Sequence, residues 1–254
     1  MATTDLDVEG RECLSFTVEG PWAHFRRIDA TTEKLTYRVM PRTTVAGLIA
    51  AVLGEPRDSY YQTFAQDASA IAISPQCRLE TQSVPMLTLP TKSGNIKTAD
   101  GVSGKTVVDP EDIASERKRR TFEYVVDAAY RIDLVLEDTE TFERLREFLE
   151  TGRSTYTPAL GKTECLADIT NVRVSTVESG GDPEAISSTV PEEHVVPTPG
   201  SPLRMERTPA YMEADESGRK TTGFVSYAYS TGEKTLSAPD APVSTVDGRT
   251  VCFL

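Results

Sequence analysis

Basic and aromatic side chains alternate through residues 20–45, in the stretch GPWAHFRRIDATTEKLTYRVMPRTTV. Five Lys or Arg residues stand there against Asp29 and Glu33, so the local net charge is +3. Cationic side chains bind phosphate oxygens, and exposed aromatic rings stack on unpaired bases. These residue types together indicate contacts with a single-stranded nucleic acid. The candidate residues in this stretch are Trp22, His24, Phe25, Arg26, Arg27, Tyr37 and Arg42.

A second basic cluster precedes a strand-like run of alternating apolar residues that begins at Phe122. Residues 90–116, just before it, lack hydrophobic periodicity and are long for a loop inside a compact domain. We therefore expect a β-hairpin-like arm, inserted over residues 78–120, whose basic end clamps RNA. A solvated strand start would explain the same charges without any ligand. The cluster consists of Arg117, Lys118, Arg119 and Arg120.

A glycine and a lysine form the third candidate site, in the segment TPALGKTEC at residues 157–165. At Gly161 the missing side chain lets backbone N–H groups approach a phosphate closely. Lys162 adds a positive charge at the same place. An ordinary connection between a helix and a strand is the alternative interpretation of this turn.

Hydrophobic patterns predict the elements that must position these residues. Leu14, Phe16 and Val18 alternate with other residues as the buried side chains of a strand do. Gly20 and Pro21 should end that strand, because proline has no N–H group to donate to a ladder.

A helix is predicted next, between Pro41 and Gly54. Its apolar residues recur at i, i+3, i+4, i+7 and i+8, glycine is a common C-terminal cap, and Thr43 or Thr44 should cap its start. A second helix is predicted over residues 138–152, with an apolar stripe and acidic residues near its start. The apolar set of the first helix is Val45, Leu48, Ile49, Val52 and Leu53.

Further apolar runs predict strands near residues 70–73, 122–134 and 169–177. The order strand, helix, strand, arm, strand, helix, strand predicts an α+β, ferredoxin-like domain over residues 1–177, with the topology of an RNA recognition motif (RRM). Residues 178–254 are expected to form an acidic surface linker and a C-terminal β extension that packs on the same domain.

The net charge of −12 opposes nucleic-acid binding, but the acidic residues are concentrated in two regions. Residues 1–12 carry a net charge of −3 and residues 176–218 a net charge of −7, which leaves −2 for the rest. Arg outnumbers Lys by 19 to 8. An acidic composition poor in lysine predicts a halophile, where the screening length falls to about 3 Å near 1 M salt. RNA binding would then depend on short-range arginine contacts and stacking.

The composition argues against several kinds of site. The four cysteines lie far apart, and His24 and His194 are the two histidines of the chain. We therefore expect buried thiols and no metal site, cofactor or Ser-His-Asp triad. There is no run of about 18 apolar residues, and the N-terminus is polar, which predicts a cytoplasmic protein without a membrane span.

Three segments occur in a familiar order: PRTTVAGLIAAVLG with RDSY at residues 41–60, RTFEYVVDAAYRIDL at 120–134, and LGK at 160–162. Together with the strand that leads to Gly20-Pro21, they resemble the CRISPR-associated "Cas-five" family. That family belongs to the repeat-associated (RAMP) superfamily of RNA-binding proteins. The resemblance covers residues 14–177 and leaves the C-terminal part unmatched.

The resemblance implies a RAMP fold and a role in antiviral defence. The chain would be a non-catalytic subunit of a type I CRISPR interference complex (Cascade), of a subtype I-B and haloarchaeal-like kind. It would bind the 5′ handle of the guide RNA, cap the filament of backbone subunits and contact the large subunit that recognises target DNA. The candidate residues above would all serve as RNA contacts.

Two other functions fit parts of the sequence. One branch of the family cleaves precursor CRISPR RNA without metal, using a tyrosine, a lysine and a histidine. Tyr37 matches the setting of that tyrosine, and Lys118 could serve as the lysine. Neither histidine of the chain is near the arm in sequence, so the sequence offers no histidine there to act as the general acid or base. An acidic protein–protein module without RNA is the third interpretation, which the charge segregation disfavours.

Overall fold

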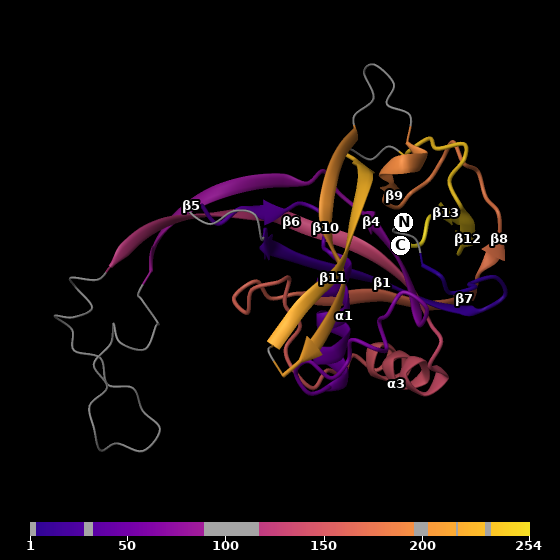
Figure 1. Cartoon of the computed structure of the whole chain (residues 1–254), viewed down its shortest axis with the longest axis horizontal. Helices are drawn as coiled ribbons and strands as arrows, with labels where there is room; N and C mark the ends of the chain where they lie inside the picture. Colours follow the sequence, from indigo (N-terminus) through magenta and orange to yellow (C-terminus); the bar gives the residue numbers. More distant parts are fainter. Residues whose placement is uncertain (1–3, 28–32, 89–116, 196–202, 217, 232–234) are drawn as a thin grey trace.

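The computed structural model describes residues 4–27, 33–88, 117–195, 203–216, 218–231 and 235–254. This part of the chain is mainly β structure, with two longer helices, α1 (Arg42–Leu53) and α3 (Thr139–Glu150), so the protein is of the α+β type (Figure 1). The main antiparallel sheet has the order β4-β6-β1-β7, and β5 also pairs with β6. Its strands are β1 (Glu12–Ala23), β4 (Ser69–Pro75), β5 (Glu80–Thr88), β6 (Lys118–Leu136) and β7 (Asp168–Thr176).

The sheet lies between two layers because both of its faces are apolar near the centre. On one face, Leu14 and Phe16 belong to the same buried cluster as Ile49 of α1 and Leu145 of α3. The other face includes Cys13 in a cluster with residues of the C-terminal strands. Strand alternation sends neighbouring residues to opposite faces, so β1 contributes to both cores.

Helix α1 confirms the predicted apolar set, whose members are all buried. Gly54, with φ 75°, ends the helix in the left-handed conformation that glycine adopts without strain. The predicted threonine cap is wrong: Pro41 occupies the N-cap position, and no side chain caps the helix there. Helix α3 begins as predicted, with the Asp138 carboxylate accepting from the backbone N–H groups of Glu140 and Thr141.

Strand β1 does not end at Gly20-Pro21, contrary to the sequence prediction. It continues to Ala23, with Gly20 paired to Ala128 and Trp22 paired to Val126. Pairing with β7 stops at Glu19, and Pro21 stands opposite Asp127 of β6, which has φ 47°. Proline is therefore tolerated here because this part of β1 has a paired neighbour on one side only, as at the edge of a sheet.

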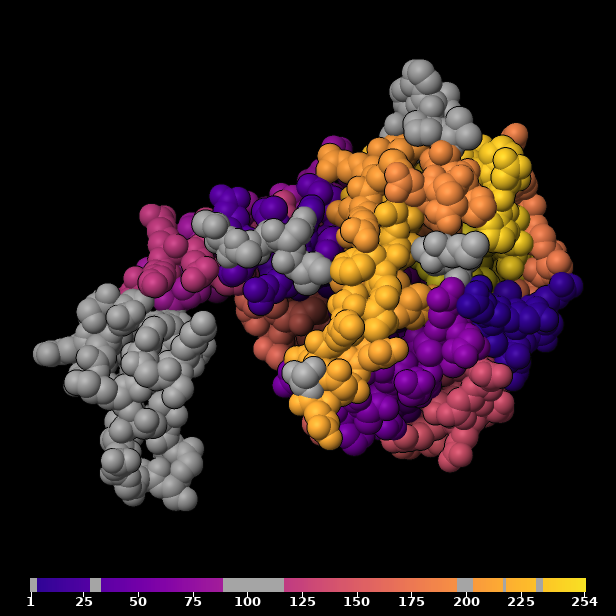
Figure 2. Space-filling model, in the orientation of Figure 1, coloured from indigo at the N-terminus to yellow at the C-terminus, as the bar shows by residue number. Residues whose placement is uncertain are grey.

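Most of the remaining strands lie in the C-terminal region, and β2 and β3 lie near the N-terminus. A long hairpin of β10 and β11 crosses one side of the molecule, and its orange-to-yellow surface is prominent in Figure 2. The shorter elements form small sheets with it and with one another. The strands of the hairpin are β10 (Leu203–Asp215) and β11 (Gly218–Ser230). The shorter elements are β2 (Phe25–Arg26), β3 (Thr36–Tyr37), β8 (Glu178–Ser179), β9 (Val190–Pro191), η1 (Glu192–His194), β12 (Ser244–Val246) and β13 (Arg249–Val251).

Part of the expected surface linker is buried. Ile186, Ser188, Thr189 and Val190 are each at most 2% exposed, and the two apolar ones join a third core cluster with Leu236. The polar composition of this stretch hid its packing. Ser188 Oγ donates to the backbone oxygen of Thr189 and accepts from the distant backbone N–H of Cys252, whereas the buried hydroxyl of Thr189 has no hydrogen-bond partner among the described residues.

Strand β5 pairs with the first half of β6, and together they extend away from the body (Figure 1). The middle of the expected arm, residues 89–116, lies outside the described residues. Within the described ranges, no helix is long and apolar enough to cross a membrane. The cysteines among them are all free thiols, three buried and one half-buried.

Candidate nucleic-acid interface

The turn that follows Leu160 packs directly against the end of β1. The backbone N–H of His24 donates to the oxygen of Leu160 at 3.0 Å. Gly161 has φ 89°, and a Cβ atom there would lie 2.2 Å from the oxygen of His24. This position therefore requires glycine both for its left-handed backbone and for the contact with β1.

Lys162 projects from this turn over two aromatic rings of β6. Its Nζ atom lies 4.4 Å from the ring centroid of Phe122 and 3.2 Å from the hydroxyl of Tyr124. It also forms an ion pair with Glu164. Partial burial disfavours the charged lysine, but the hydrogen bonds with Glu164 and Tyr124 outweigh it and raise the pKa of Lys162. The ammonium group is therefore charged at neutral pH and held in place.

His24 links the turn to β6. Its Nδ1 atom lies 2.7 Å from the backbone oxygen of Glu123, which only accepts, so Nδ1 carries a hydrogen. Its ring lies 5.4 Å from Tyr124 and 5.8 Å from Phe122, centroid to centroid. Burial lowers the pKa of His24, so the imidazole is neutral at pH 7. His24 is therefore mainly a packing residue at the base of the site.

A groove of about 560 Å³ runs beside this cluster. Exposed Arg26 and half-buried Lys34 supply positive charge along it, and Arg120 lies close enough to influence Lys34. Desolvation, followed by the nearby charges of Arg26 and Arg120, lowers the pKa of Lys34. Cations that repel one another in this way favour an anionic ligand. The groove is lined by His24, Phe25, Arg26, Lys34, Thr44, Phe122, Gly161 and Lys162.

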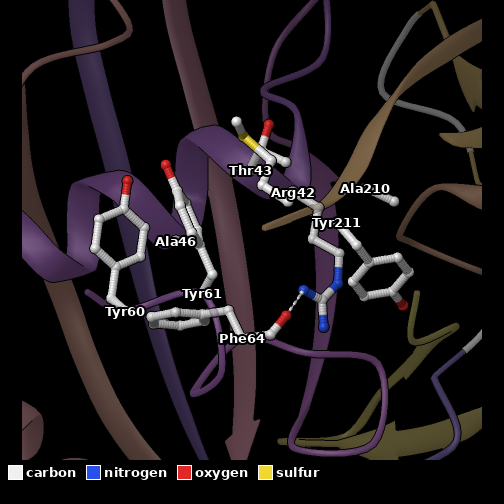
Figure 3. Close-up of a pocket in the computed structure, with 9 residues that line it drawn as sticks. Arg42, Thr43, Ala46, Tyr60, Tyr61, Phe64, Ala210 and Tyr211 are labelled. Carbon is white, nitrogen blue, oxygen red and sulfur yellow. Dashed lines mark hydrogen bonds between the residues drawn. The ribbon is translucent and has the colours of Figure 1, made fainter. Parts of the chain in front are cut away.

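Arg42 does not belong to this surface, and its predicted role in RNA binding is corrected. The side chain is only 2% exposed and donates to the backbone oxygens of Phe64, Ser69 and Leu254. Its guanidinium stacks over the ring of Tyr211 at 4.6 Å (Figure 3). Burial lowers the pKa of Arg42 to about 10. Arg42 is a structural residue that ties α1 to three other segments.

Two predicted aromatic contacts are also buried. Phe25 and Tyr37 pair across β2 and β3 and are 2% and 4% exposed. Half-buried Arg27 has its guanidinium 5.6 Å from the ring centroid of Tyr37. Trp22, by contrast, is 37% exposed. Trp22 is thus the candidate aromatic residue of the first stretch with substantial free surface.

The second basic cluster lies along the outer end of the β5–β6 ladder. Lys118 pairs with Thr88, Arg119 with Leu87 and Arg120 with Met86. Residues 117–119 are exposed, and Arg120 is half-buried near the groove. The structure therefore places Arg120 near Lys34 of the groove, while Lys118 and Arg119 lie on the projecting part of β6 and Arg117 just before it.

Five residues of the site were not predicted to belong to it: Lys34, Thr44, Phe122, Tyr124 and Glu164. The strand pattern assigned both β6 aromatics to the core, although Phe122 is only half-buried. The signal that could have found Phe122 and Tyr124 is the basic cluster just before Phe122, because side chains two residues apart lie on the same face of a strand. Among the described residues, no cluster of His, Cys, Asp or Glu is arranged to hold a metal ion.

Fold and groove together define an α+β protein that presents cations and aromatic rings along one open surface. The model of the family described as CRISPR-associated protein (Cas_Cas5) matches residues 13–234, and the chain belongs to this family. The match extends past residue 177, so strands of the C-terminal region share the family pattern as well.

Solved structures with a similar fold come from the same biological system. A chain of a "CRISPR RNA-guided surveillance complex" gives a TM-score of 0.52 at 13% identity, over 89% of this chain and 91% of that chain. A CRISPR protein from Archaeoglobus fulgidus gives a TM-score of 0.53 at 12% identity, over 94% and 98%. At these identities the similarity concerns the fold. A search of curated proteins found no match.

Proposed function

We propose that this chain is a non-catalytic, RNA-binding subunit of a type I CRISPR interference complex (Cascade) in antiviral defence. It holds the 5′ handle of the guide RNA and caps the filament of backbone subunits. It contacts the large subunit and thereby acts on target DNA indirectly. The observation that carries the proposal is the groove, where Lys162 and Arg26 supply charge beside the ring of Phe122.

The groove suits single-stranded RNA for a physical reason. A phosphate needs short contacts to cations, and an unstacked base needs an apolar or aromatic surface close by. Lys162 is fixed by Tyr124 and Glu164, so little side-chain entropy is lost when it binds a phosphate. The close packing of Gly161 on His24 sets the distance between the turn and the sheet.

Several finer points belong to the same proposal. The sheet order β4-β6-β1-β7 supports a ferredoxin-like interpretation of the domain, and the β5–β6 pair supports an arm that reaches along RNA. We assign the complex to subtype I-B on the family resemblance and its source to a halophile on the acidic, lysine-poor composition, and we place it in the cytoplasm.

The test is binding and cleavage of a labelled CRISPR repeat RNA in high-salt buffer, with and without the backbone subunit. Wild type should bind intact RNA, and the double variant Arg26→Ala/Lys162→Ala should bind at least tenfold more weakly. Lys220→Ala, on the exposed end of β11, is the matched control and should bind like wild type. Absence of binding under both conditions would refute the proposal.

A metal-independent endoribonuclease is the second candidate, and one arrangement favours it. His24, Tyr124 and Lys162 form one cluster. His24 could therefore serve as the general acid or base for which the sequence alone offered no candidate near the arm. The neutral imidazole of His24 has the protonation state of a general base. Tyr37, the tyrosine expected for this activity, is instead buried.

Cleavage products in the presence of a metal chelator would support this second function. They should then disappear in both His24→Asn and Tyr124→Phe, while Tyr37→Phe should cleave like wild type. Intact RNA after prolonged incubation supports the non-catalytic role.

A further inference from the structure

A second concavity adjoins the groove and has a different character. We call it the Trp22 pocket; its lining residues are Trp22, Val84, Met86, Tyr124, Glu164 and Cys165. Its volume of about 240 Å³ is below the roughly 300–1,000 Å³ typical of sites for drug-sized ligands. One flat ring system is the kind of group that such a pocket accommodates.

Apolar walls of the pocket are exposed and fixed at the same time. Trp22 is 37% exposed and Met86 is 38% exposed. The Tyr124 hydroxyl lies 3.4 Å from the Met86 sulfur, and the Tyr124 ring meets the indole of Trp22 edge-on, with centroids 5.8 Å apart. Tyr124 is only 7% exposed, so its position is fixed by the surrounding protein. Its contacts with Trp22 and Met86 therefore hold both walls of the pocket in position. A ligand can thus contact the walls without a costly rearrangement.

Glu164 is the charged group of the pocket. Its side chain is 51% exposed and its carboxylate is paired with Lys162. The hydrogen bond from Lys162 lowers the pKa of Glu164, which keeps the carboxylate ionised. An ionised carboxylate only accepts hydrogen bonds, so it favours a ligand edge that carries N–H groups over one that carries carbonyl oxygens.

Pocket and groove share the turn at residues 161–165: Gly161 and Lys162 line the groove, and Glu164 and Cys165 line the pocket. Lys162 contacts Tyr124 and Glu164 of the pocket and Phe122 of the groove. A nucleotide whose phosphate is bound by Lys162 therefore has the Trp22 pocket within reach of its own base or of the adjoining base.

We propose that the Trp22 pocket holds one unstacked nucleobase with an exocyclic amino group, which contacts Trp22 and Met86 and donates a hydrogen bond to Glu164. Adenine, cytosine and guanine carry such a group, and uracil does not. This inference rests on the proposed RNA-binding function and adds a base-selective position to it.

Fluorescence offers a direct test, because Trp22 is the one tryptophan of the chain. The probe is a set of repeat RNAs in which each position in turn is made abasic. Intact RNA should quench the tryptophan emission, and one abasic RNA should still bind but fail to quench. Tight binding with equal quenching by every abasic RNA, or with no quenching at all, would overturn the proposal.

Affinities provide the second measurement. A base stacked on an aromatic residue contributes about 1–3 kcal/mol, so the critical abasic change should weaken wild-type binding about 5- to 150-fold. The same change should have no further effect in Trp22→Ala. Tyr156→Ala removes an exposed aromatic ring outside the pocket and should respond like wild type. An undiminished abasic effect in Trp22→Ala would overturn the assignment.

Selectivity is tested with deamino analogues of the base at that position: purine riboside for adenosine, inosine for guanosine or a pyrimidinone riboside for cytidine. Wild type should prefer the amino form severalfold, and Glu164→Gln should lose most of that preference. An unchanged preference in Glu164→Gln would refute the role of the carboxylate. Failure of wild type to bind any repeat RNA would instead refute the proposed function, and this inference with it.

Discussion

The backbone oxygen of His24 lies where a side chain at residue 161 would have to be: a Cβ atom on Gly161 would be 2.2 Å away from it. This contact joins the turn that carries Lys162 to the end of β1. The position of the lysine over β6 is therefore set by a glycine and a backbone atom rather than by the lysine itself.

Gly161→Ala should consequently damage both stability and RNA binding. Left-handed backbone costs a non-glycine residue about 1–2 kcal/mol, and the alanine methyl group must also push the turn away from β1. Gly152→Ala is the matched control, because Gly152 has φ 65° and nothing within 4 Å of its added Cβ. Urea unfolding should show a larger loss for Gly161→Ala. Equal losses in the two variants would contradict the role of the close contact.

Lys162→Ala should weaken RNA binding without selectivity among bases. Removing one phosphate contact to a single strand lowers the slope of log K against log salt by about 0.7. Binding isotherms over a series of salt concentrations measure that slope. Lys220→Ala should leave it unchanged. An unaltered slope in Lys162→Ala would mean that this lysine does not contact a phosphate.

Arg42→Met should unfold much more easily than wild type. The substitution removes a donor from three buried carbonyl groups. Ser69 keeps the hydroxyl of Thr4 as a donor and Leu254 keeps the backbone N–H of Ile71, but the carbonyl of Phe64 has no other donor among the described residues. An unpaired buried polar group costs about 1–3 kcal/mol. Exposed Arg26→Ala should change stability by less than about 0.5 kcal/mol while weakening RNA binding. The measurement is denaturant unfolding of both variants. A stable Arg42→Met that loses RNA would reverse our correction of Arg42.

His24 should make the protein less stable in mild acid. Burial lowers its pKa in the folded state below the ordinary 6.5, so the unfolded chain binds more protons as the pH falls through 6.5. Stability is full above pH 6.5 and should fall below it, by up to about 1.4 kcal/mol per pH unit, until the folded histidine also becomes protonated. His24→Asn should lose this component. The measurement is the free energy of unfolding of wild type and His24→Asn as a function of pH. Parallel profiles for the two proteins would contradict a contribution of His24 to the loss of stability in acid.

Local patterns in the sequence determined much of the framework. The apolar repeat and Gly54 located α1, and Asp138 located the start of α3. A continuous apolar run located β4, and alternating or repeated apolar residues located β6 and β7. These features are local, because periodicity, caps and glycine conformations depend on residues within a few positions of one another. The motifs also indicated the family, which the match over residues 13–234 confirms.

Only the tertiary structure decided which of the candidate residues share a surface. Lys162 forms a hydrogen bond with Tyr124, 38 positions away in the sequence, and His24 forms one with Glu123, 99 positions away. Neither contact leaves a periodic signal in the sequence.

Burial was decided in the same way. Arg42 and Arg26 are equally basic in the sequence, yet one is enclosed by three backbone oxygens and the other is exposed. Which cation a core can enclose depends on acceptors brought from distant segments. That arrangement exists only once the sheet, the helices and the C-terminal strands have packed together.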